Sequence, residues 1–291
     1  MRTTHQNNDS TPMTLPIPLA PMRLHRLPMM LAFGATDVGL VREGNEDNFL
    51  LDEALGLAMV ADGMGGHAAG EVASAGVLMA LRDYLAGHAP PFAAGGTGGS
   101  VFADPDATWS DPAAGTVRTL HAAVGHANAS LYAQNRASGR ADGGGMGTTL
   151  TGFWRPTGAH SLVAFHVGDS RLYRLRGGVL EQLTRDQTVY QQAVEAGILD
   201  HLPARNLLLQ AVGPSAAVTP EVRSHPVLPG DVLMLCSDGL HGSVPHGEME
   251  HLLAGATEGT LEIRAAQLIE KAKAYGGRDN ITVVLALCGS D

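Results

Sequence analysis

The segment RLYRLRGGVLEQL (residues 171–183) contains two short runs in which apolar and polar residues alternate, joined by Gly177-Gly178. Alternation with a period of two is typical of strands that bury one face. A Gly-Gly pair supplies the positive φ angles that a two-residue hairpin turn requires. The segment therefore predicts an antiparallel β-hairpin.

Other short apolar runs bounded by Gly, Asp or Asn predict further strands, at 56–62, 148–154, 161–169, 231–238 and 280–287. Apolar residues spaced three and four apart predict helices at 67–87, 116–138, 187–197 and 259–274. The strands follow one another in meanders, whereas the helices come in pairs. This order favours an α+β sandwich of antiparallel sheets covered by helices over a doubly wound parallel fold.

The composition is that of a folded protein with a moderate acidic excess. The 291 residues include 19 Lys and Arg against 29 Asp and Glu, a net charge of −10, and 44% of them are apolar. This balance excludes a disordered acidic chain and gives no general attraction for nucleic acid or for an anionic membrane surface.

The sequence predicts a cytoplasmic protein. It has no run of eighteen apolar residues, and its first thirty residues lack the pattern of a signal peptide. Its two cysteines, Cys236 and Cys288, both lie in apolar runs, which is typical of buried, reduced thiols.

Two segments interrupt the pattern of helices and strands. Residues 1–30 are polar and rich in proline, and we expect a flexible N-terminal arm there. Residues 88–115 are rich in Gly, Pro and Ala and predict a surface loop between two helices. We therefore expect residues 31–291 to form a single domain.

Four of the apolar strands carry an aspartate at one end. Asp62, Asp169 and Asp238 follow their strands, whereas Asp279 precedes the last one. If that last strand runs antiparallel to its neighbours, all four carboxylates gather at one edge of the sheets. Like charges gathered in a cleft are costly without cations, and ligands that are all oxygen suit Mg²⁺ or Mn²⁺ better than zinc. A single Asp-Gly pair would indicate only a turn, but four at strand ends favour a metal site.

Two neighbouring segments extend this prediction. In DGMGGH (62–67) the glycines let the main chain approach an ion, so the carbonyl of Gly63 is a candidate metal ligand beside Asp62. In REGNED (42–47) Arg42 could hold a phosphate, and Asp47 could hydrogen-bond a water on the metal. On its own, this second motif would equally indicate a surface ion pair.

Taken in order, these motifs resemble the bacterial branch of the metal-dependent serine/threonine protein phosphatases, the PPM or type-2C family. The resemblance covers about residues 33 to 287 and rests on Arg42…Asn45-Glu46-Asp47, DGMGG (62–66), GMGTTL (145–150), VGDSR (167–171), CSDGL (236–240) and RDNITVV (278–284). It implies a four-layer α-β-β-α sandwich with two central, mainly antiparallel sheets and with two Mn²⁺ or Mg²⁺ ions between them.

The resemblance also implies roles for the metal ligands. Asp62 would bridge the two ions, the carbonyl of Gly63 would bind one of them, and Asp238 and Asp279 would complete the shell of the other. Asp169, together with Asp238, matches the pair that holds a third ion in bacterial relatives.

The implied reaction is hydrolysis of phosphoserine and phosphothreonine by direct attack of a water that the two ions activate. Arg42 matches the phosphate-binding arginine of the family, and it would stabilise the phosphoryl oxygens together with the metal charge. The implied partners are phosphorylated proteins, namely the targets of a serine/threonine kinase and the kinase itself.

The sequence departs from the family pattern at two places. Met64 stands where many eukaryotic relatives carry a histidine that is proposed as the general acid; His67 is a candidate substitute, although its place near a helix start has a simpler structural explanation. Residues 184–213 resemble the mobile flap of bacterial members, but Gln187 stands where relatives often have histidine. This second departure bears on the choice of substrate.

Two further motifs resemble those of other phosphatase classes. Asp104-Pro105-Asp106-Ala107-Thr108 matches the D-x-D-x-T motif of aspartyl-nucleophile phosphatases, but it follows a Gly-rich stretch and is expected in a loop. Cys236 lacks the arginine that a thiolate phosphatase needs six residues on, where Gly242 stands. A non-catalytic phosphatase-like regulatory module and a small-molecule phosphohydrolase remain as alternatives.

Overall fold

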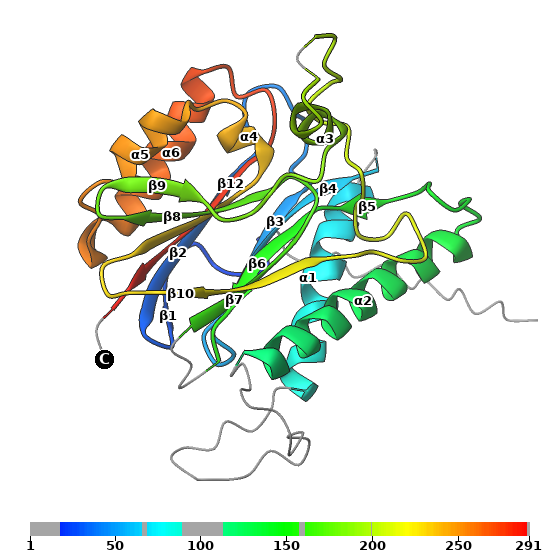
Figure 1. The fold of residues 1–291 in the computed structure, drawn as a ribbon, viewed down its shortest axis with the longest axis horizontal. Helices are drawn as coiled ribbons and strands as arrows, with labels where there is room; N and C mark the ends of the chain where they lie inside the picture. The colour runs from blue at the N-terminus through cyan, green and yellow to red at the C-terminus, as the bar shows by residue number, and fades with distance from the viewer. Residues whose placement is uncertain (1–17, 66–68, 89–112, 157–160, 199, 290–291) are drawn as a thin grey trace, which may run out of the picture.

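The computed structural model describes residues 18–65, 69–88, 113–156, 161–198 and 200–289. Two β-sheets face each other in the centre, and helices cover the outer face of each sheet (Figure 1). The expected four-layer sandwich is therefore confirmed.

The first sheet has six strands, and every neighbouring pair is antiparallel. In spatial order they are β1 (Leu24–Leu27), β2 (Met30–Asp37), β12 (Ile281–Cys288), β11 (Val232–Cys236), β8 (Arg171–Arg176) and β9 (Val179–Gln182). The predicted hairpin is the pair β8 and β9, and Gly177 and Gly178 in its turn have φ angles of 58° and 85°. Positive φ angles are unfavourable for residues that carry a Cβ atom, which explains the two glycines in this turn.

The second sheet is also antiparallel throughout. Its strands run in the order β10 (Glu221–Pro226), β7 (Ser161–Val167), β6 (Leu150–Trp154), β4 (Leu57–Met64) and β3 (Asp47–Asp52), and the short β5 (Gly147–Thr148) pairs with the end of β4. The register places Asp47 opposite Asp62. Two acidic residues thus face each other at the end of this sheet.

Each sheet carries its own helices (Figure 1). The long helices α1 (Ala69–His88) and α2 (Ala114–Ala137) pack on the second sheet. The first sheet is covered by α4 (Asp238–His241), α5 (His246–Leu253), a 3-10 turn (Glu258–Thr260) and α6 (Leu261–Ala274). Helix α3 (Val189–Glu195) belongs to the flap segment and lies apart from both layers.

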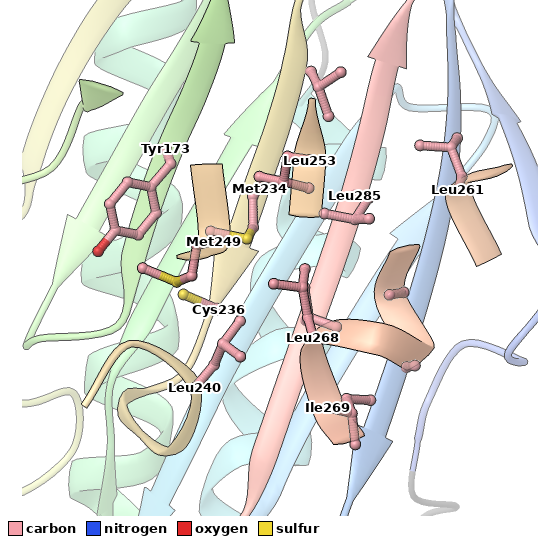
Figure 2. Close-up of a cluster of buried hydrophobic side chains, with 14 of the residues drawn as sticks. Tyr173, Met234, Cys236, Leu240, Met249, Leu253, Leu261, Leu268, Ile269 and Leu285 are labelled. Carbon is pink, nitrogen blue, oxygen red and sulfur yellow. The ribbon is translucent and has the colours of Figure 1, made fainter. Parts of the chain in front are cut away.

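Three clusters of buried apolar side chains fill the three interfaces between the four layers. One lies between α1, α2 and the second sheet, and another lies between the two sheets, around Phe49, Phe153 and Leu235. The third lies between the first sheet and helices α4 to α6, where Figure 2 shows Met234 and Leu285 of the sheet facing Leu268 of α6. Burial on both faces explains why the strands of this fold read as nearly continuous apolar runs.

The structure corrects and extends the expected boundaries. Residues 24–27 fall within the predicted N-terminal arm, yet they form β1 and pair with β2, so the arm ends earlier than residue 30. Leu27 buries its side chain between the sheets, which explains why this short strand is retained. Residues 1–17 of the predicted arm and most of the predicted loop (89–112) lie outside the described residues. Strands β2 and β10 and helices α4 and α5 were not predicted.

Both cysteines are buried and neither forms a disulfide. Cys236 belongs to the cluster in Figure 2, and Cys288 belongs to the cluster between the sheets. Burial raises the pKa of each thiol to about 12. Cys236 is therefore part of the core and is not a thiolate nucleophile, as expected. Within the described residues, no helix combines the length and the apolar character needed to span a bilayer.

The packing of β2 against β3 predicts the effect of one substitution. A Cβ atom on Gly34 would lie 2.6 Å from Cδ2 of Phe49, between the sheets, where neither can move away easily. We expect Gly34→Ala to lower the free energy of unfolding in urea by about 1–3 kcal/mol.

The matched control is Gly125→Ala, on an exposed face of α2 with no atom within 4 Å of the added Cβ. There the change should raise stability by about 0.5–1 kcal/mol through helix propensity. Equal effects at the two sites would contradict the packing described here.

Candidate active site

A cavity of about 560 Å³ opens where both sheets end, and four aspartates contribute to its wall. Asp62 lies near the end of β4, Asp169 follows β7, Asp238 follows β11 and Asp279 precedes β12. Because β12 is antiparallel to both β11 and β2, the start of this strand meets the ends of the others. The gathering expected from the sequence is therefore present.

The main chain of Asp62 is fixed by two threonines of the strand connection that follows α2. The Asp62 N–H donates to Oγ1 of Thr149 at 2.9 Å, and the Asp62 carbonyl accepts from Oγ1 of Thr148 at 2.8 Å and from the Thr149 N–H at 2.9 Å. The Thr149 hydroxyl is in turn 2.7 Å from Oγ of Ser170, beside Asp169. This network joins the main chain of Asp62 to Ser170, the residue that follows Asp169.

Three glycines around the cavity leave room for close neighbours, which are main-chain carbonyls at Gly63 and Gly239 and the side chain of Glu46 at Gly70. A side chain on Gly63 would collide with the carbonyl of Gly70 at the start of α1, and one on Gly239 would collide with the carbonyl of Asn280. A Cβ on Gly70 would meet Cδ of Glu46 at 2.5 Å. The absence of these side chains lets Asp238 and Asp279 approach each other, as it does Asp62 and Glu46.

The electrostatics of the carboxylates are unfavourable in the absence of cations. The pKa of Asp62 is raised well above its ordinary value, first by burial and then by the charges of Asp47 and Asp238. Burial and the charge of Asp238 raise the pKa of Asp169 to about 7. The pKa of Asp238 is also raised, by burial and by Asp279. Each group would thus be stabilised by a bound positive charge.

The residues present fit a hard divalent metal ion. Oδ1 of Asp238 is buried and has no hydrogen-bond partner, an arrangement that is costly unless a cation binds there. The donors around the cavity are carboxylate and carbonyl oxygens, which are the ligands that Mg²⁺ and Mn²⁺ prefer. Among the described residues, no three His, Cys, Asp or Glu side chains are already gathered into a finished shell.

Arg42 lies at the mouth of the cavity. Its Nη2 donates to Oδ2 of Asp279 at 2.8 Å, and 48% of its side chain is exposed. The alternative of an ordinary surface ion pair is thus half right, because Arg42 is paired. Its partner, however, is one of the four cavity aspartates, which places a guanidinium next to the candidate metal site.

Asn280 holds the loop that carries Arg42. Its Oδ1 accepts from the Glu46 N–H at 2.8 Å, and its Nδ2 donates to the carbonyls of Val38 at 3.0 Å and Gly44 at 2.9 Å. One buried amide therefore pins both ends of the loop. Asn280 lies in the RDNITVV motif, yet nothing in that motif indicates that its side chain holds the loop of Arg42.

Asp47 does not line the cavity but lies below it, between the sheets. Its Oδ2 accepts from Oγ of Ser237 at 2.6 Å, and the Ser237 Oγ in turn accepts from the Thr282 N–H at 3.1 Å. Burial raises the pKa of Asp47 to about 7, with the two hydroxyl residues opposing the shift. This position agrees with support of the site from below.

The turn that presents Asp169 is held by Gln187 and His241. The Gln187 N–H donates to the Gly168 carbonyl at 2.7 Å, and Oε1 of Gln187 accepts from the Gly168 N–H at 2.9 Å and from Nε2 of Gln210 at 3.0 Å. Nε2 of His241 lies 3.0 Å from the Asp169 carbonyl, and burial lowers the pKa of this imidazole to about 3. Gln187 thus connects the turn that carries Asp169 to the start of the flap, where it lies itself, and to Gln210 near the end of the flap.

Some predicted site residues lie outside the described residues, and some residues that line the cavity were not predicted. His67 and the segment 104–108 lie outside the described residues. Met64 lines the cavity, as do seven residues that were not predicted as site residues: Glu46, Gly65, Thr149, Asn206, Leu207, Leu208 and Asn280. Glu46 stands within the quoted REGNED motif, so its carboxylate was a detectable signal.

The chain matches the model of the family described as Protein phosphatase 2C over residues 42–269. A serine/threonine phosphatase, stp, from Listeria innocua is 36% identical over 259 residues, which are 86% of this chain and 92% of that protein. The serine/threonine protein phosphatase PstP from Mycobacterium tuberculosis is 37% identical over 268 residues, 90% of this chain and 46% of PstP.

Solved structures agree. The structure of Mycobacterium tuberculosis PstP/Ppp has a TM-score of 0.73 at 34% identity and covers 90% of this chain and 99% of that one. The PstP catalytic domain in complex with two manganese ions has a TM-score of 0.70 with the same identity and coverage.

The charge repulsion predicts that Asp62→Asn stabilises the metal-free protein. An aspartate whose folded-state pKa is raised destabilises the folded state increasingly as pH rises through that pKa, and asparagine removes this effect. In excess chelator at pH 8 we expect the variant to melt several degrees higher, since about 2–4 °C corresponds to 1 kcal/mol in a domain of this size.

Asp83→Asn is the control, because Asp83 is an exposed residue of α1 whose partner is the adjacent Arg82. Its melting temperature should change by less than about 2 °C. A drop in the melting temperature of the Asp62 variant would mean that the carboxylates do not repel one another as described.

Proposed function

The chain is a member of the protein phosphatase 2C family, the metal-dependent serine/threonine protein phosphatases, and on this premise we propose that the cavity described above is its catalytic centre. The observation that carries the proposal is the meeting of four strand-end aspartates from both sheets around one cavity, with Arg42 at its mouth. The donor set supports two Mn²⁺ or Mg²⁺ ions, and the PstP structure holds two manganese ions.

The four aspartates divide into two groups by position. Asp62, Asp238 and Asp279, with the carbonyl of Gly63, would hold the two central ions. Asp169 lies toward a second, smaller cavity that also contains Asp238, which supports a role for this pair in binding a third ion. When bound, such ions lower the pKa of a water molecule for direct attack on phosphorus and neutralise phosphate charge.

The protein groups orient the phosphate and limit what can react with it. Arg42 presents a planar guanidinium that can bind two phosphoryl oxygens, while its contact with Asp279 fixes its direction. Met64 cannot donate a proton to the leaving oxygen, and no histidine occurs among the described residues that line the cavity. We therefore assign that proton to solvent water, for which the cavity has room.

The substrates and setting extend the proposal. Phosphoserine and phosphothreonine proteins are the expected substrates, and a serine/threonine kinase and its targets are the expected partners. Two buried, unpaired thiols support a cytoplasmic location. Because both sheets contribute to one cavity, we propose that β1 to β12 form a single phosphatase domain.

Hydrolysis of a phosphothreonine peptide tests the function. We expect purified protein to release phosphate with Mn²⁺ or Mg²⁺ and not with chelator, because the carboxylate site needs a cation. Asp238→Asn should lower kcat by about 100-fold or more, since a buried, otherwise unpartnered ligand oxygen is lost.

Asp83→Asn serves again as the matched control and should retain full turnover. No release with any metal by a folded protein would favour a regulatory module or a small-molecule substrate. Full activity in Asp238→Asn would show that the centre lies elsewhere.

A second test addresses how Arg42 is positioned. Asn280→Ala removes three hydrogen bonds that hold the loop, so we expect kcat/KM to fall by about tenfold or more, as in Arg42→Ala. If Asn280 acts through Arg42, the double variant should lose little more than the worse single variant. Losses that multiply would show that the two side chains act independently.

A further inference from the structure

Exposed large apolar side chains are concentrated beside the catalytic cavity. Among the described residues fourteen are substantially exposed, and seven of them lie in only two segments that border the cavity. These seven are Val38, Leu40 and Val41 of the loop before β3, and Val194, Ile198, Leu207 and Leu209 of the flap. Scattered apolar residues are normal on a surface, but this grouping is typical of a binding surface.

The first segment is tied to the cavity through its main chain. Leu40 and Val41, which are 66% and 64% exposed, directly precede Arg42. The Leu40 N–H donates to the carbonyl of Gly277 at 2.7 Å, two residues before Asp279. Their position is therefore set by the segment that forms the cavity wall.

The second segment contributes to the cavity wall near Asp169, since Asn206 also lines the smaller neighbouring cavity together with Asp169. Leu207 is 50% exposed and contributes to the cavity wall together with Leu208. The carbonyl of Leu207 accepts from the Val189 N–H at 2.8 Å, and Leu208 forms a β-bridge with Thr188. The flap therefore presents Leu207 from a hydrogen-bonded frame.

Charge at the cavity argues against recognition of acidic neighbours of the phosphate. Arg42 is the one basic residue among the described cavity-lining residues, and it is paired with Asp279. The lining also contains the acidic residues Glu46, Asp62, Asp169, Asp238 and Asp279. Bound ions would offset part of this negative charge, and Arg205 of the flap, which lines the smaller neighbouring cavity, stacks on the ring of Tyr190.

Resting on the proposed function, we propose that Leu40, Val41 and Leu207 form an apolar rim that binds apolar side chains next to the phosphorylated residue of a protein substrate. In an extended peptide the neighbouring side chains lie 3–4 Å further along the chain, on alternate faces. With the phosphate in the cavity, the substrate residues before and after it therefore come within reach of the loop before β3 and of the flap. Burial of apolar surface from both partners would favour such substrates.

The test compares phosphothreonine peptides that differ only in the residues flanking the phosphate: leucine, glycine, glutamate or lysine. The readout is the ratio of kcat/KM for the leucine peptide to that for the glycine peptide, so that any general change in turnover cancels. For the unmodified protein we expect a ratio of about ten. Leu40→Ser, Val41→Ser and Leu207→Ser should each lower it about three- to fivefold.

Val179→Ser is the matched control, because Val179 is 65% exposed on β9, outside the cavity, and its variant should keep the ratio. A ratio near one, a preference for lysine that the three variants leave unchanged, or equal effects in the control would overturn the proposal. Turnover of the glycine peptide reports the phosphatase activity separately, so failure of the rim and failure of the function are distinguishable.

Discussion

Repulsion among carboxylates that the fold holds at the ends of its strands is the constraint on which the rest of the structure depends. Asp62, Asp169 and Asp238 all have raised pKa values because burial and neighbouring charge disfavour their ionised forms. Such a cluster is tolerated only where other parts of the chain supply enough stability. Here three apolar interfaces, one on the outer face of each sheet and one between the two sheets, supply it at a distance from the charges.

The interface between the sheets changes character along its length. Around Phe153 and Leu235 it is fully apolar, but toward the cavity hydroxyl groups replace the apolar side chains. Thr149 bonds to Ser170, and Ser237 bonds to Asp47, so these hydroxyl groups below the carboxylates have partners. A polar layer of this kind fixes the strand ends against one another, since its hydrogen bonds are satisfied in one register only. The arrangement of the four cavity aspartates is therefore a property of strand register.

The predictions succeeded where the signal was local and repetitive. Apolar runs located most of the central strands, and an aspartate at the end of four of these runs located the cavity wall. Features that depend on tertiary contacts were missed: β1 is polar enough to resemble an arm, and it is a strand because Leu27 reaches the core. The role of Asn280 was likewise invisible, because its three partners lie more than 200 residues away along the chain. The position of a residue relative to a strand shows at which edge of the sheet it lies, but it does not show which residues distant in the sequence its side chain will bond.

The last strand has a consequence for synthesis. β12 lies between β2 and β11 in the middle of the first sheet, and it brings Asp279 and Asn280 to the loop of Arg42. A nascent chain that has not yet emerged through β12 leaves β2 and β11 unpaired along facing edges and lacks one of the four carboxylates. On the proposed role of Asp279 in holding a metal ion, dephosphorylation begins only once β12 has joined the sheet, and a ribosome stalled before β12 displays a chain whose open strand edges can pair with other strands.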